Sequence, residues 1–62
     1  MWFSVVWFDK DSGKLIRAKV NHTQLFHKFD FENHINSVIA FTREAGIGSD
    51  IMVGNCFIVR IR

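Results

Sequence analysis

The chain alternates between short apolar runs and polar turns, and its N-terminal part predicts a β-hairpin. Residues Trp2–Phe8 are almost all aromatic or β-branched, which is typical of a strand that is buried on both faces. A polar segment that contains Gly13 follows and predicts a tight turn. From Leu15 to Val20 apolar and basic residues alternate, so we expect a half-buried strand with Arg17 and Lys19 on its polar face.

Two segments with helical spacing follow the hairpin. Residues 21–29 fit either a short helical turn capped by Thr23 or a loop that packs on the core. The next segment predicts an amphipathic helix, because Asp30 can cap its start, Gly46 can cap its end, and apolar residues recur every three or four positions. The predicted apolar stripe consists of Phe31, Ile35, Val38, Ile39, Thr42 and Ala45.

The C-terminal segment, Ile51–Arg62, predicts one long strand in which Gly54 marks a bulge or a bend. The order strand, strand, helix, strand predicts an α+β fold of the type ββαβ, with a three-stranded antiparallel sheet (order 2-1-3) and one helix packed on one face. The central position of the first strand would explain why both of its faces are apolar. No predicted element remains to cover the other face of the sheet.

The predicted turn determines which side chains share that uncovered face. If Lys10 and Lys14 flank the turn, then Ser4, Val6 and Phe8 lie beneath the helix, and a slip of one residue would exchange the two faces. With this register, we expect the uncovered face to have an aromatic centre and a basic rim. It would carry Phe3, Val5, Trp7, Arg17, Lys19, Ile58, Arg60 and Arg62.

The length of 62 residues predicts a single small domain, residues 1–62, with a marginal core. Such folds usually gain stability from disulfides, a metal ion or self-association. Cys56 is the only cysteine, which excludes a disulfide within the chain and suits a reducing compartment. No apolar run approaches the roughly 18 residues of a membrane span, and no secretory signal pattern is present. We therefore expect a cytoplasmic protein that does not bind membranes.

The residues that carry chemistry form no recognisable catalytic or metal-binding pattern. His22, His27 and His34 are not joined by a cysteine or an acidic pair at a zinc-ligand interval. Cys56 lies within a predicted strand, where a free cysteine packs as a small hydrophobic residue. Each acidic residue flanks a turn or lies near the end of a predicted element. We expect no enzyme, no metal site, no cofactor and no small-molecule substrate.

The aromatic content indicates a binding surface. Seven phenylalanines and two tryptophans are more than so small a core can enclose, whereas the net charge of +2 is modest. The first hypothesis is a small non-catalytic intracellular protein-binding module, such as a phage or plasmid inhibitor or antitoxin that occludes a larger partner. The residues expected to bind that partner are Phe3, Trp7, Arg17, Lys19, Arg60 and Arg62.

Two alternatives use the same surface differently. In one, single-stranded RNA or DNA stacks its bases on Trp7 or Phe3, and the basic residues contact phosphates. In the other, the surface is the seam of a homodimer, and the function lies on the histidine-bearing segment and the helix exterior. The residues of that exterior are His22, His27, Lys28, His34, Asn36 and Arg43.

Overall fold

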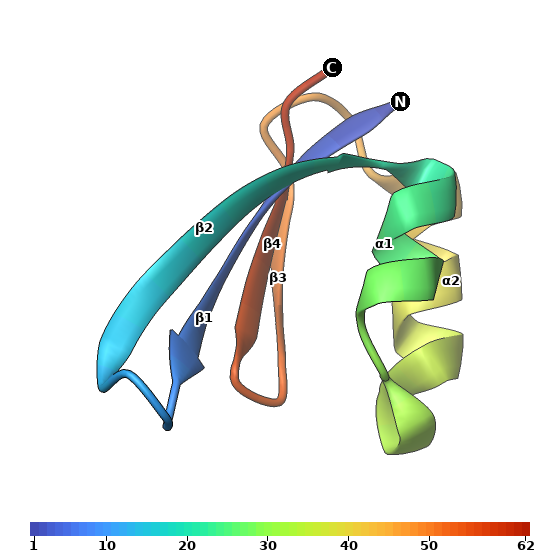
Figure 1. Cartoon of the computed structure of the whole chain (residues 1–62). Helices are drawn as coiled ribbons and strands as arrows, with labels where there is room; N and C mark the ends of the chain where they lie inside the picture. The colour runs from blue at the N-terminus through green and yellow to red at the C-terminus, as the bar shows by residue number, and fades with distance from the viewer.

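The N-terminal hairpin pairs β1 (Trp2–Asp9) with β2 (Lys14–Asn21) in a computed structural model that describes all residues, 1–62 (Figure 1). Its loop ends at Gly13, whose φ of 71° lies in the left-handed region that glycine tolerates. The Gly13 amide donates to the Asp9 carbonyl oxygen (2.8 Å), and the Asp11 amide donates to the Asp9 carboxylate (3.1 Å). Asp9 pairs with Lys14, so the loop between them, Lys10–Gly13, has four residues. The predicted turn, flanked by Lys10 and Lys14, has three.

Residues 21–29 form a helix, α1 (His22–Lys28), rather than a loop. Asn21 caps it, not Thr23 as predicted. The Asn21 side chain accepts a hydrogen bond from the Gln24 amide (2.8 Å), and the Gln24 side chain accepts one from the Asn21 amide (2.9 Å). This reciprocal capping box fixes the point at which the chain leaves β2 and turns onto the sheet.

The predicted amphipathic helix is confirmed as α2 (Ile35–Glu44), which follows a single 3-10 turn at Glu32–His34. Asp30 accepts a hydrogen bond from the Glu32 amide (3.2 Å), so it stabilises the start of the 3-10 turn instead of capping α2. On the apolar stripe Val38 and Thr42 are buried.

The end of α2 differs from the prediction. Ala45 takes an extended conformation directly after the helix, and its amide donates to the Phe41 carbonyl oxygen. Gly46 therefore forms no left-handed cap, whereas Gly48 in the following loop has a φ of 90°. Gly48, two positions after the predicted cap Gly46, is thus the residue with the left-handed conformation between α2 and the sheet.

The predicted C-terminal strand is two strands, β3 (Asp50–Val53) and β4 (Cys56–Arg60). Gly54 is not a bulge: its φ of 58° and the negative φ of Asn55 form a two-residue hairpin turn of type II′. β4 lies antiparallel beside β1, as expected for the last strand, and β3 returns along its outer edge. The α+β class with an antiparallel sheet is confirmed, but the three-stranded sheet of order 2-1-3 with one helix was wrong. The sheet has four strands in the order β2-β1-β4-β3, and the chain has two α-helices.

Both helices lie on the same side of the sheet, and the opposite face has no covering element (Figure 1). The core forms between the helices and the sheet from Phe3, Val5, Val20, Leu25, Phe31, Val38, Val53, Cys56 and Ile58. Only 11 of the 62 residues are buried. The core includes no side chain from the uncovered face of the sheet. Neither α-helix has the length and apolar character that a membrane-spanning helix requires.

Candidate functional site

The pairing of the strands determines which residues face the solvent on the uncovered side. Phe3, Val5 and Trp7 of β1 pair with residues that face the helices, so the even-numbered residues of β1 point the other way. The uncovered face consists of Trp2, Ser4, Val6 and Phe8 of β1, Leu15, Arg17 and Lys19 of β2, Phe57 and Val59 of β4, and Asp50 and Met52 of β3.

Large apolar side chains on this face are open to solvent. The exposed fractions are 73% for Leu15, 66% for Met52, 47% for Phe8 and 36% for Trp2. Val6, which pairs with Arg17 and Phe57, is half-buried although no helix covers it. Because these residues share one face of a continuous sheet, they form an extended apolar surface rather than scattered exposed side chains.

The charges of this face lie at its two opposite edges. Arg17 and Lys19 belong to β2, and Asp50 belongs to β3. Lys19 and Asp50 end the same row, which runs through Ser4 and Val59 across the two central strands. Three strand spacings separate them, about 14 Å, so they cannot form an ion pair within one chain. The face therefore has a positive edge, an apolar centre and a negative edge.

The register explains why the predicted aromatic centre was wrong. Phe3 is fully buried among core residues, and Trp7 is half-buried, with its ring 5.0 Å from that of Phe29 in an edge-on contact. The extra loop residue closed by Asp9 shifts the pairing by one position and turns the odd-numbered residues of β1 toward the helices. The uniformly apolar sequence of β1 could not reveal this shift. The Asp9–Asp11 spacing, which suits an Asx turn, was the available signal.

The predicted basic residues separate into two groups. Arg17 and Lys19 are exposed on the uncovered face, as expected. Arg60 points to the opposite side, where its guanidinium donates to the carbonyl oxygen of Ala45 and caps the C-terminal end of α2. Its Nε also donates to the Arg62 carbonyl oxygen (3.2 Å), and Arg62 itself is exposed beyond β4. Arg60 is therefore a structural residue in this fold.

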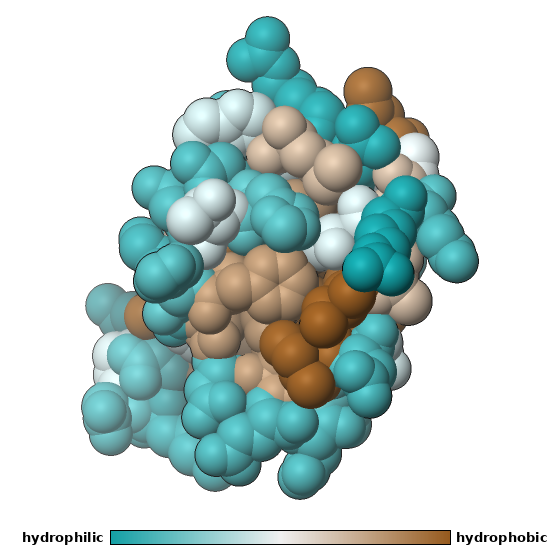
Figure 2. Space-filling view, turned by 90° about the vertical axis from the view of Figure 1, so that its right-hand side faces the viewer, coloured by the Kyte–Doolittle hydropathy of each residue, from teal (hydrophilic) through white to brown (hydrophobic).

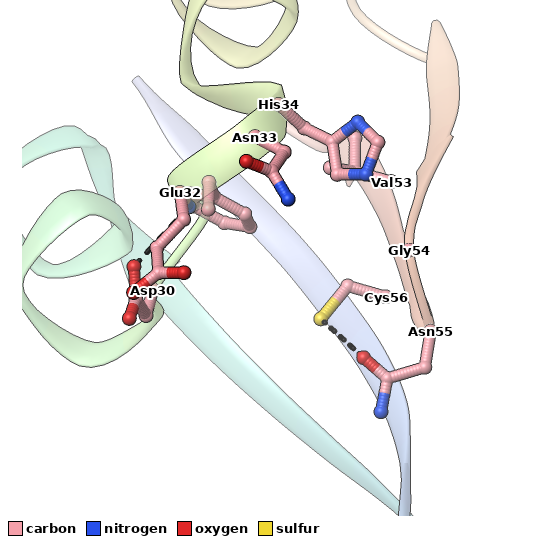
Figure 3. A pocket seen from close by; sticks show the side chains of 9 residues that line it. Asp30, Glu32, Asn33, His34, Val53, Gly54, Asn55 and Cys56 are labelled. Carbon is pink, nitrogen blue, oxygen red and sulfur yellow. Dashed lines mark hydrogen bonds between the residues drawn. The ribbon is translucent and has the colours of Figure 1, made fainter.

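A polar pocket of about 260 Å³ lies between the 3-10 turn and the β3–β4 turn (Figure 3). Figure 3 shows the Cys56 thiol turned toward Asn55, whose side-chain oxygen accepts from it at 3.6 Å. His34 and Val53 line the same pocket. Burial raises the pKa of the Cys56 thiol. No three His, Cys, Asp or Glu side chains are grouped so that they could hold a metal ion.

A second pocket, of about 300 Å³, opens between the helices. It is lined by His22, Phe26, Ile39, Thr42 and Arg43. Figure 2, which looks onto the helices, shows apolar side chains gathered near the centre and polar ones around them. The His22 ring packs 5.1 Å from that of Phe26, and the Thr42 hydroxyl donates to the Ile39 carbonyl oxygen (2.9 Å). The Thr42 hydroxyl is thus satisfied within α2, and four of the exposed large apolar side chains, Trp2, Phe8, Leu15 and Met52, lie on the uncovered sheet face instead.

Comparisons with known proteins find no relative: no family model, no curated protein and no solved structure matches the chain.

Proposed function

We propose that this chain is a small, non-catalytic protein-binding module that docks onto its partner through the uncovered face of the sheet. The observation that supports the proposal most is the exposure of Trp2, Phe8, Leu15 and Met52 on one face. Burial of apolar surface contributes about 25 cal/mol per Å², so a complementary apolar partner surface would gain substantial free energy here. Exposed aromatic side chains and charges at the edges of the surface are also features of protein interfaces.

The pocket beside Cys56 supports the non-catalytic part of the proposal. A thiol acts as a nucleophile in its thiolate form, and the raised pKa keeps the Cys56 thiol protonated at neutral pH. Its hydrogen-bond partner is the amide oxygen of Asn55, which cannot take the proton as a general base. The pocket therefore lacks the nucleophile–base contact that covalent catalysis needs.

Single-stranded nucleic acid is the second candidate partner, because Trp2, Phe8 and Phe57 share the face with Arg17 and Lys19. The charges make it the weaker candidate. Two phosphate contacts would give a slope of log affinity against log salt of only about −1.4. Asp50 on the same face would repel the backbone. A salt titration of single-stranded RNA, followed by tryptophan fluorescence, measures this slope directly.

The proposal is tested by site-specific photocrosslinking in cells that express the chain. A benzophenone amino acid replaces Phe8 in one variant and Asn36, an exposed residue of α2, in the matched control. We expect discrete protein adducts from position 8 and none of the same mass from position 36. RNA adducts at position 8 would instead support the second candidate. Protein adducts from position 36 alone would place the function on the helices, and the proposal would fail.

A further inference from the structure

The arrangement of charges on the uncovered face restricts how a second copy of the same face could pack against it. A two-fold axis parallel to the strands, between β1 and β4, places β2 of one copy over β3 of the other and keeps each row at the same height. Lys19 of each copy then faces Asp50 of the other, twice per dimer. Arg17 extends over the exposed Met52 of the partner copy, where its aliphatic stem can pack.

The alternative face-to-face arrangement is disfavoured by the same charges. A two-fold axis perpendicular to the strands would place β2 over β2, so that Arg17 and Lys19 would meet their own copies. Like charges placed together in an interface suppress that mode of association. The face is thus self-complementary in one orientation and self-repulsive in the other.

We infer that a second copy of this chain covers the uncovered face, in the orientation that pairs Lys19 with Asp50. The inference rests on the proposed function and names its partner. The resulting dimer is a sandwich of two four-stranded sheets, about 10 Å apart, with helices on both outer surfaces. It places Val6 over Phe57 and Ser4 over Val59 of the other copy and covers Met52, whereas Phe8 and Leu15 extend over the β3–β4 turn.

The size of the overlap fits only a weak, reversible dimer. In this orientation the long strands β2 and β1 lie over the shorter strands β3 and β4 of the other copy, so four, five, five and four residues overlap. With a rise of about 3.3 Å per residue and a strand spacing of about 4.8 Å, this overlap covers roughly 290 Å² of each copy in projection. The two copies together bury about 600 Å² before the relief of the side chains is counted, which lies below the scale of about 1,000 Å² at which specific interfaces begin. We therefore expect a weak dimer that forms at high micromolar concentration and dissociates on dilution.

The test is sedimentation equilibrium of the purified chain and of two charge-reversed variants, Lys19→Glu and Asp50→Lys. Each variant alone converts both intermolecular pairs from attraction to repulsion, and we expect a dimer about tenfold weaker than that of the wild type. Both positions are exposed, so far-UV circular dichroism should show unchanged folding.

An equimolar mixture of the two variants provides the matched control, because it restores opposite charges in both pairs. In one pair, the carboxylate introduced at position 19 of the first variant meets the ammonium group introduced at position 50 of the second. In the other pair, the unchanged Asp50 of the first variant meets the unchanged Lys19 of the second. The mixture should therefore dimerise at least as well as the wild type.

Each result decides between the two proposals. A wild type that stays monomeric up to millimolar concentration overturns the inference, and so does a dimer that ignores the charge reversals. If position 8 still crosslinks to another protein in that case, the proposed function stands and only the identity of the partner was wrong. If position 8 crosslinks to nothing, both fail.

Discussion

Replacing Val5 and Val6 separately by alanine tests the strand register on which the uncovered face depends. The two residues are adjacent in the middle of β1 and have the same side chain, so the change in strand propensity is the same for both. Val5 is fully buried and pairs with Ala18 and Ile58 on the helix side. Val6 is half-buried on the uncovered face.

The expected difference follows from burial. Val5→Ala removes two methyl groups from the core, which costs about 1.6 kcal/mol in transfer free energy at about 0.8 kcal/mol each. The cavity left behind adds up to about 1 kcal/mol, so the free energy of unfolding should fall by about 2–3 kcal/mol. Val6→Ala keeps solvent access and should cost about 0.5–1 kcal/mol, since only part of its surface is buried. For a domain of this size, about 2 kcal/mol corresponds to a Tm lower by about 8–16 °C.

The measurement is urea and thermal unfolding followed by far-UV circular dichroism, at a concentration low enough to keep the chain monomeric. Wild-type protein and the two variants are compared in the same buffer. A register shifted by one residue would place Val6 under the helices and Val5 in solvent, so it predicts the opposite order. If Val6→Ala is the more destabilising variant, the assignment of the uncovered face is refuted, and the two proposals built on it fail as well.

Three further predictions concern single residues. Arg60→Ala should lower the free energy of unfolding by about 1–2 kcal/mol, because it removes the charged donor to the Ala45 carbonyl, whereas a urea titration of Arg62→Ala should stay within about 0.5 kcal/mol of the wild type. Gly54→Ala should cost about 1–2 kcal/mol in thermal unfolding, since the added Cβ meets no atom within 4 Å and the loss comes from the φ of 58°. An equal effect of Gly46→Ala, which lacks a positive φ, would contradict this reason. Burial raises the pKa of the Cys56 thiol above 9.0 in the folded state. The burial of the protonated thiol therefore contributes fully to the free energy of unfolding below about pH 9. This contribution is lost as the pH rises through the folded-state pKa. In urea titrations at several pH values, the free energy of unfolding of Cys56→Val should fall less at alkaline pH than that of the wild type. The same pH dependence in both proteins would contradict this role of Cys56.

The local patterns of the sequence determined the strand β2 and the helix α2, but not the division of the C-terminal segment into β3 and β4. The alternation in β2 separates Arg17 and Lys19 from Ala18 and Val20 because successive strand residues point to opposite faces, whatever the strand pairs with. The stripe of α2 predicted Val38 and Thr42 on the buried side for the same kind of reason, since three or four residues complete one helical turn. These properties belong to single elements, so they can be derived from neighbouring residues alone.

Which face of β1 is buried depends on the tertiary structure. Its two sets of side chains are almost equally apolar, so burial of either set gives a similar free energy, and one hydrogen-bonded loop residue selects between them. The same holds for Arg60, which reaches Ala45 across fifteen positions of sequence, and for the row that joins Lys19 to Asp50 across four strands. Contacts between residues so far apart depend on the strand order and the pairing, which the helices and both hairpin turns fix together.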